Sequence, residues 1–340
     1  MAFSKNTAPW RPERARDPCR RLRLAVAASS VLLAAGAQTF AGRAAVVLSS
    51  QARPYQQAQV ELSARMTKLD HVTRTLSLTD LAKRPKLPVA GDEVYVAVGT
   101  KAAVWLSRAL PKNVPLVFCM VSDPNAAGLN NDPRACGIQT SVPLAAQFAL
   151  VAKALPKARS LGMLRKTPPS ANDRLAQEVI RTLPKGWRLQ TAAISRHKSV
   201  ADAIEDLLGR DVDIVWTVPD AAVYNAATVR SLLLGAIRRK KPVFGFSASF
   251  VRAGALLGVG IDPRAQGRQA AGIADLVLKA QASGTSTCPA AELPPAQRFP
   301  DPEFQVALNL IVARKLSITL PSSLVKRTAW VFGRDEGAKR

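Results

Sequence analysis

The sequence of 340 residues contains few of the side chains on which most catalytic sites depend. Its two histidines, His71 and His197, lie far apart, and neither belongs to a His-Glu-x-x-His or a Cys-x-x-Cys motif. A zinc site and imidazole catalysis are therefore disfavoured, and we expect both histidines to be exposed loop or helix residues. Aromatic residues make up only 5% of the chain, whereas 48% of it is hydrophobic, so a packed core of aliphatic residues is available and wholesale disorder is excluded.

Three common motifs of enzymes are incomplete. The Gly-Thr-Lys at 99–101 lacks the glycine-rich loop that cradles phosphate, and the Gly-Val-Gly at 258–260 meets Pro263 where a dinucleotide site needs a third glycine. The segment 245–249 (GFSAS) is one glycine short of a nucleophile elbow. The sequence therefore predicts no enzyme, no cofactor and no metal site.

The chain also lacks an apolar run long enough to span a bilayer. The stretch Leu24–Ala37 (LAVAASSVLLAAGA) has 14 residues, fewer than the roughly 20 that a spanning helix needs. Seven basic residues precede it and Ala35-Gly36-Ala37 ends it, which is typical of a cleaved signal peptide over residues 1–37. Because Cys19 lies before the apolar stretch and no cysteine follows it closely, we expect a soluble exported protein with no lipid anchor.

Acidic residues are scarce: 48 Lys and Arg face 24 Asp and Glu, and residues 38–340 retain 41 and 22, a charge of +19. The densest run, Arg238–Lys241, is typical of a solvated helix end, with a binding patch as the alternative. Export and the scatter of the positive charges argue against a nucleic-acid partner. Cys119, Cys136 and Cys288 follow the signal peptide, which allows one disulfide plus one free thiol.

From residue 44 onward, short apolar runs alternate with helical stretches in two successive sets. The strands we expect are 44–50, 76–78, 93–98 and 115–121, then 160–164, 189–194, 213–218, 242–246 and 255–260. The helices we expect are 54–66, 101–110 and 143–155, then 172–183, 199–208, 226–238 and 264–280. Residues 283–302 form a linker, and 304–320 a strand followed by a helix. Continuous apolar strands alternating with helices predict an α/β protein with two doubly wound parallel sheets and a cleft between them.

Polar residues follow many of these strands. They comprise Ser49-Ser50, Gly99-Thr100, Ser122-Asp123-Pro124, 169–173, Pro219-Asp220 and 247–249. In open α/β sheets the ligand crevice lies outside the carboxyl ends of the strands. Hydroxyls and helix N-termini there suit a carboxylate, and an aspartate suits an ammonium group. The alternative at each single position is plain helix capping, for which the same residue types are preferred.

Seven stretches carry a resemblance to a known family. They are VAVGTKAAVWL (96–106), PLVFCMVSDPNAAGL (115–129), CGIQTSV (136–142), LPKARSLGMLRK (155–166), VDIVWTVPDAAVY (212–224), KPVFGFSASFVRAGALLGVGIDPRAQGRQAA (241–271) and VALNLIVARKLSITLP (306–321). In this order and spacing they resemble the exported substrate-binding proteins of ABC transporters with the type I periplasmic-binding fold, in the family that includes binders of tryptophan and other aromatic amino acids.

The resemblance implies two lobes joined by a hinge that close on a small ligand without performing chemistry. We assign residues 44–155 with about 261–290 to lobe 1, 156–260 to lobe 2, and 291–340 to a C-terminal arm with a basic tail. Ser50, Thr100, Ser122 and Asp123 would line lobe 1. Asp220, as partner of an ammonium group, and Ser247 would line lobe 2.

Where many relatives have Glu-x-Asn-Ser, this chain has PPSAND (168–173), so Asn172 would replace that contact. Tyr55, Trp105 and Tyr224 are candidates for aromatic walls, although Trp105 on a helix face also suits the core. The implied function is capture of an amino acid or related carboxylate for an ABC permease in the inner membrane. The alternative is a periplasmic sensor that reports ligand occupancy to a membrane kinase or receptor.

Overall fold

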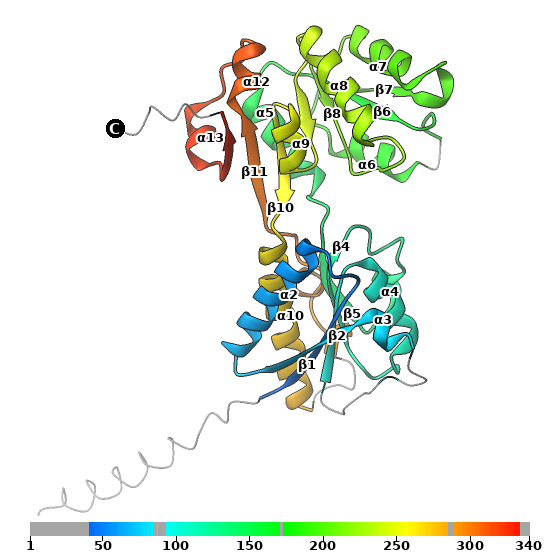
Figure 1. Ribbon diagram of the computed structural model, residues 1–340, viewed down its shortest axis with the longest axis vertical. Coiled ribbons are helices and arrows are strands. Elements are labelled where there is room, and N and C mark those ends of the chain that lie inside the picture. Colours follow the sequence, from blue (N-terminus) through cyan, green and yellow to red (C-terminus); the bar gives the residue numbers. More distant parts are fainter. Residues whose placement is uncertain (1–40, 84–86, 88–92, 171–172, 285–288, 334–340) are drawn as a thin grey trace, which may run out of the picture. The chain divides into compact units, whose positions relative to one another are not determined.

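The computed structural model describes residues 41–83, 87, 93–170, 173–284 and 289–333. The expected signal peptide, Asn172 and Cys288 lie outside these residues. The described chain forms two largely parallel β-sheets with helices on both faces (Figure 1). The predicted fold class, α/β with two doubly wound lobes, is confirmed.

The first sheet has the strand order β2-β1-β3-β4-β5, and all its neighbouring strands are parallel. Its strands are β1 (Arg43–Leu48), β2 (Val72–Ser77), β3 (Glu93–Val98), β4 (Leu116–Val121) and β5 (Ala135–Gln139). Its helices are α2 (Arg53–Thr67), α3 (Leu78–Leu81), α4 (Thr100–Ala109) and α10 (Pro263–Ala282), with short turns η2 (Leu129–Asn131), η4 (Pro289–Ala291) and α11 (Pro295–Arg298).

Strand β1 shows why these strands read as continuous apolar runs. Ala44, Val46 and Leu48 pack on the face covered by α2 and α10, while Ala45 and Val47 pack on the face covered by α4. Successive side chains of a strand point to opposite faces, so a strand buried on both sides must be apolar throughout. The α2–α10 contact is close enough that a Cβ on Gly267 would lie 2.1 Å from the Ala58 carbonyl oxygen.

The second sheet has the order β12-β11-β10-β9-β8-β6-β7, in which only the β10–β11 pair is antiparallel among the described strands. Its strands are β6 (Ser160–Arg165), β7 (Arg188–Ala193), β8 (Ile214–Trp216), β9 (Val243–Gly245), β10 (Leu257–Ile261), β11 (Phe304–Asn309) and β12 (Trp330–Phe332). Its helices are α5 (Leu144–Ala154), α6 (Arg174–Thr182), α7 (Val200–Gly209), α8 (Ala226–Arg238), α9 (Ala248–Ala253), α12 (Leu310–Lys315) and α13 (Ser322–Arg327), with the turn η3 (Ile194–Arg196).

Two segments pack differently from the division expected from the sequence. Helix α5 was assigned to lobe 1, but Phe148 and Val151 pack with Trp216 of the second sheet. Residues 304–332 were assigned to a separate arm, but β11 and β12 extend the second sheet at its edge. The chain therefore passes between the sheets at 140–143, after β10 at 262, and before β11 at 300–303 (Figure 1).

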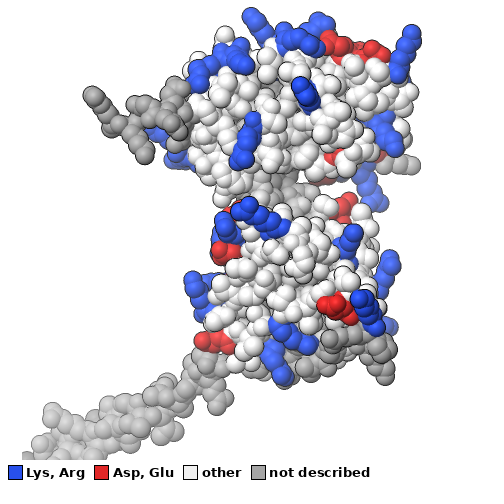
Figure 2. Space-filling model, viewed as in Figure 1, with Lys and Arg blue, Asp and Glu red and all other residues white. Residues whose placement is uncertain are grey.

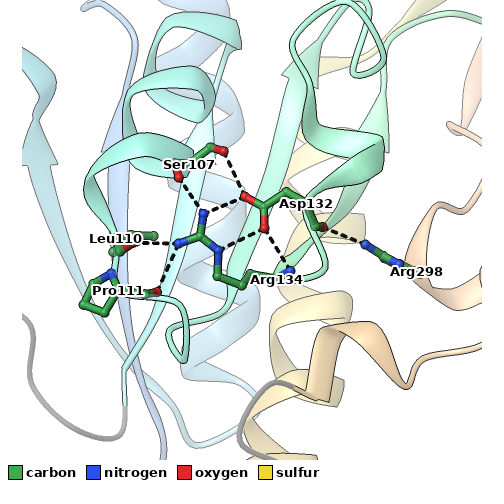
Figure 3. Close-up of polar contacts among 6 residues, drawn as sticks. All are labelled: Ser107, Leu110, Pro111, Asp132, Arg134 and Arg298. Carbon is green, nitrogen blue, oxygen red and sulfur yellow. Dashed lines mark hydrogen bonds and ion pairs between the residues drawn. The ribbon is translucent and has the colours of Figure 1, made fainter.

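A saturated arginine fixes the amino end of the first sheet (Figure 3). Arg134 is buried, and all five of its guanidinium N–H groups have oxygen acceptors within the chain. The acceptors are the carbonyls of Ser107, Leu110 and Pro111 and both carboxylate oxygens of Asp132. These three carbonyls belong to the carboxyl end of α4 and the turn after it, where a helix leaves carbonyls without internal partners. Arg298 from the linker donates to the carbonyls of Asp132 and Ala135 and so fastens the linker to the same place.

Candidate functional site

Each sheet has one point at which its topology reverses. In the first sheet, β1 leads into α2 on one face and the neighbouring β3 leads into α4 on the other. In the second, β6 leads into α6 on one face, and β8, its neighbour, leads into α8 on the other. Both sheets thus have the same doubly wound order, for which the ligand site lies at the carboxyl ends of the strands flanking the reversal.

At the reversal in the first sheet, Ser49 joins the two strands. Its Oγ accepts a hydrogen bond from the Ala102 N–H at 2.9 Å, so the serine after β1 caps the helix that follows β3. Gly99 has φ +98, and a Cβ there would lie 2.6 Å from Ser49 Oγ and 2.9 Å from Tyr55 Cε1. Only glycine fits this turn. Ser49 and Ser50 were both identified in the sequence as polar residues that follow the first strand, but only Ser50 was expected to contact the ligand.

The four expected ligand residues of lobe 1 occupy the carboxyl edge of the first sheet. Ser50 is exposed, and its Oγ accepts from the Ala52 N–H at 3.3 Å. Thr100 begins α4, and its hydroxyl makes no hydrogen bond to the described residues. Ser122 and Asp123 follow β4, are exposed, and the Asp123 carboxylate accepts from the Ala126 N–H at 2.8 Å. Local turn hydrogen bonds therefore occupy Ser50 and Asp123, whereas the Thr100 hydroxyl has no partner among the described residues.

Asp220 and Ser247 occupy the carboxyl edge of the second sheet. Asp220 follows β8, and its Oδ1 accepts a hydrogen bond from the Ala222 N–H at 2.9 Å. Its Oδ2 accepts no hydrogen bond from the described residues. Ser247 follows β9, and its Oγ caps α9 by accepting from the Phe250 N–H at 3.2 Å. Both residues are partly buried. The expected contact of Asn172 falls outside the described residues.

A charged pair at the same edge was not singled out from the sequence. Arg165, the last residue of β6, is ion-paired through Nη2 with Oδ2 of Asp173, whose other oxygen caps α6 by accepting from the Ala176 N–H at 3.0 Å. Tyr224 lies nearby and donates its hydroxyl to the Leu164 carbonyl at 3.3 Å. Burial raises the pKa of Tyr224; the Leu164 carbonyl and Arg165 lower it, and Asp220 raises it. The backbone links the same residues, because the Tyr224 N–H donates to the Asp220 carbonyl at 2.8 Å.

The aromatic candidates divide between core and edge. Tyr55 and Trp105 are partly buried against the two cores of the first sheet, and Tyr224 is buried. Tyr224 packs with Phe246 and Phe250, whose ring centroids lie 6.1 and 6.2 Å from it. Phe246 follows β9 directly and is partly exposed, so it is the aromatic side chain of this cluster that a ligand could reach.

The expectation that both histidines are exposed was wrong for His71, which is 3% exposed and buried beneath α10. His71 Nε2 lies 2.9 Å from Asp275 Oδ1, and its Nδ1 accepts from the Gly42 N–H at 3.0 Å. His197 is partly buried beside Asp206. In the described part of the chain, no three His, Cys, Asp or Glu residues gather as a metal site.

The cysteine at position 119 and the basic run Arg238–Lys241 both have structural surroundings that explain them. Cys119 is fully buried, and burial raises its pKa to about 12. Arg238 and Arg239 of the basic run pair with Glu205, and Lys241 donates to the Val212 carbonyl. The face drawn in Figure 2 shows Lys and Arg spread over both sheets and not gathered in one patch. None of the described helices is both long and apolar enough to cross a membrane.

Gln266 holds the strand ends where the chain leaves the first sheet. It is fully buried on α10, its Oε1 accepts from the Met120 N–H at 3.0 Å, and its Nε2 donates to the Gln139 carbonyl at 3.1 Å. Met120 is in the left-handed region at φ 57. The amide therefore satisfies two backbone groups left unpaired at a register shift between β4 and β5.

Comparison with solved structures supports the fold. A ligand-free, open substrate binding protein with adhesive properties from Clostridium difficile matches with TM-score 0.64 and 17% identity, over 86% of this chain and all of that one. An ABC domain from Streptococcus pneumonia in complex with L-Trp matches with TM-score 0.56 and 19% identity, over 86% of this chain and 100% of that one. A solute binding protein from R. palustris in complex with 4-hydroxybenzoate matches with TM-score 0.51 and 10% identity, over 79% and 92%.

No curated protein sequence matches this chain. The family model described as ABC transporter substrate binding protein matches residues 63–331, which include both sheets apart from β1 and the last residue of β12. This match covers most of the chain and agrees with the repeated doubly wound order of the two sheets. The protein therefore belongs to the ABC transporter substrate binding protein family.

Proposed function

We propose that this protein is an exported solute-binding protein that captures an amino acid or a related small carboxylate and delivers it to an ABC permease in the inner membrane. The observation that carries the proposal is the repeated topology. Both sheets present polar side chains at the carboxyl ends of strands flanking a reversal, where α/β sheets bind small ligands. The ligand would lie between the two edges and stabilise the closed arrangement of the lobes by contacting both.

The chemistry at the edges supports a zwitterionic or carboxylate ligand. On lobe 1, the N-terminus of α4 and the Thr100 hydroxyl offer donors to an anion. On lobe 2, the Asp220 carboxylate keeps one oxygen for an ammonium group. One structural neighbour is in complex with L-Trp and another with 4-hydroxybenzoate, and each of these ligands contains a carboxylate and an aromatic ring. The signal peptide expected at residues 1–37 supports delivery to the periplasm.

A thermal-shift screen tests the proposal. The chain from Gln38 is unfolded and refolded to remove any captured ligand, and then screened against amino acids, small carboxylates and sugars. A ligand at 100 times its Kd stabilises the folded state by about 2.7 kcal/mol, a shift of a few degrees in Tm. Hits confined to one chemical class would support a binding protein and identify its cargo; a refolded chain with no hit in any class would count against it. Stimulation of the permease ATPase by the loaded protein then separates delivery from sensing.

A further inference from the structure

Arg165 differs from Arg134 in how its guanidinium group is hydrogen-bonded. Arg134, at the amino end of the first sheet, uses all five guanidinium N–H groups on protein oxygens. Arg165, at the carboxyl end of β6, has one oxygen partner, Asp173, and its side chain is only 15% exposed. An arginine in a purely structural role, like Arg134, has its donors paired, because an unpaired buried donor costs free energy.

The remaining donors of Arg165 lack oxygen acceptors within the described chain. Its Nε is buried without a hydrogen-bond partner, and the sole contact of Nη1 is the Met163 sulfur at 4.0 Å, a weak acceptor. Asp173 cannot turn to serve them, because its second oxygen is engaged by the Ala176 N–H at the start of α6. The ion pair therefore fixes the guanidinium in place while leaving part of its donor fork unused.

The unpaired donors of Arg165 lie at the carboxyl edge of the second sheet, where the ligand is proposed to bind. Strand β6 flanks the reversal in the second sheet, and its neighbour β8 leads to Asp220. Tyr224 connects the two residues: its hydroxyl donates to the carbonyl of Leu164, the neighbour of Arg165, and its N–H donates to the Asp220 carbonyl at 2.8 Å. The partly exposed Phe246 packs against the same tyrosine, so a cation, a carboxylate and an aromatic ring all belong to residues at or next to the contacts of Tyr224.

We propose that Arg165 is the anion-binding residue of lobe 2 and that it pairs with the carboxylate of the ligand, held in position by Asp173. The planar fork of an arginine matches a carboxylate in shape and charge. The inference rests on the proposed function, since it assigns the ligand of that same site to compounds with a free carboxylate. It differs from the expectation from the sequence, in which lobe 2 supplies only Asp220, Asn172 and Ser247.

The test uses matched ligands and matched variants. Pairs of small carboxylic acids and their primary amides, the L-amino acids with their amides, and a set of sugars are screened on the refolded chain. The strongest acid is then titrated into wild type, Arg165→Gln, Arg165→Lys and Lys166→Gln by calorimetry. Lys166 is the exposed neighbour of Arg165, so its removal changes the net charge by the same amount without touching the fork.

We expect acids to shift the Tm and their amides to fail. We also expect Arg165→Gln to weaken the acid at least tenfold, Arg165→Lys to lose less, and Lys166→Gln to stay within about twofold, because charge-assisted hydrogen bonds are strong and directional. Circular dichroism and Tm of the free variants report folding. If Arg165→Gln does not fold, Arg165→Lys decides, since it keeps a cation beside Asp173.

Three outcomes would overturn the inference and leave the binding function standing: equal shifts by acids and amides, hits among sugars alone, or unchanged affinity in both Arg165 variants. A wild-type chain with no hit in any class would instead count against the proposed function itself.

Discussion

The imidazole Nε2 of His71 lies 2.9 Å from Oδ1 of Asp275, a residue 204 positions later in the chain. The Gly42 N–H can only donate, so Nδ1 of His71 accepts and Nε2 carries the proton donated to Asp275. Lys279 donates to the other oxygen of Asp275 at 2.9 Å. The start of β1, the start of β2 and helix α10 are thereby joined by one buried polar group.

His71→Leu should destabilise the fold by roughly 2–4 kcal/mol, because it leaves the Gly42 N–H and the Asp275 carboxylate buried with lost partners. Urea denaturation measures the change. The other histidine is the control: His197 and Asp206 are more exposed, and His197→Leu should cost less than about 1 kcal/mol. Equal losses in the two variants would contradict a special role for His71.

Arg134→Met should cost about 3–5 kcal/mol, since it leaves the Asp132 carboxylate and the carbonyls at the end of α4 buried without their partner. The matched control is Arg188→Met, which removes a largely exposed ion pair with Asp211 and should change the free energy of unfolding by less than about 1 kcal/mol. A small loss in Arg134→Met would mean that the network relaxes around the gap.

The same network predicts a dependence of stability on pH. Burial raises the pKa of Asp132, but hydrogen bonds from Arg134 and Ser107 and the charge of Arg134 lower it below its ordinary value overall. A depressed pKa in the folded state gives stability that is complete above the unfolded-state pKa of about 4 and is lost as pH falls through the folded value. The stability difference between wild type and Asp132→Asn should therefore be largest near pH 7 and shrink below about pH 4.

Two glycines of α10 should respond to alanine with opposite signs. A Cβ on Gly267 would lie 2.1 Å from the Ala58 carbonyl oxygen, so Gly267→Ala must push α2 and α10 apart and should destabilise by about 1–3 kcal/mol. Gly272 has nothing within 4 Å of its Cβ position, and Gly272→Ala should stabilise by about 0.5–1 kcal/mol through helix propensity. Thermal denaturation of the two variants checks the sign.

Asp220→Ala should weaken an ammonium-bearing ligand by about 1.5–3 kcal/mol through loss of a charge-assisted hydrogen bond. Calorimetry with the hit from the thermal-shift screen measures this, and Glu178→Ala, an exposed acid on α6, is the control for net charge. Unchanged affinity in Asp220→Ala would remove Asp220 from the site.

Much of the fold could be predicted because its strands are buried on both faces. The strand expected at 93–98 coincides with β3, and every side chain from Val94 to Val98 is buried. Strand β2 was expected only at 76–78 but covers Val72–Ser77; it is an edge strand whose Val72 is 62% exposed, so its pattern is not apolar. Strand β5 was missed because it is short and contains Gly137. A Cβ at this glycine would lie 2.2 Å from the Phe118 carbonyl oxygen, so the close packing of the two strands requires a residue that is rare in strands.

The positions of the candidate site residues could be predicted from the sequence, but their hydrogen-bond and ion-pair partners could not. Turn residues such as Ser50 and Asp220 follow from where strands end. The contacts of Ser49 with the α4 N-terminus, or of Arg165 with Asp173, depend on which strands become neighbours and how a loop folds back. A single arginine among 48 basic residues gives no signal of that kind.

Helix α10 has a consequence for how the chain acquires its structure. Its residues Ala270, Ala274, Val277 and Leu278 complete the core that contains Val46 of β1 and Leu62 of α2. The first five strands are made long before residues 263–282, so one face of their sheet is covered only in part, by α2, until strands β6–β10 of the second sheet have been synthesised. A fragment ending before α10 would keep that apolar face in water and should aggregate. Lobe 1 is therefore a structural unit but not a continuous folding unit, because its core is complete only once about four-fifths of the chain has been made.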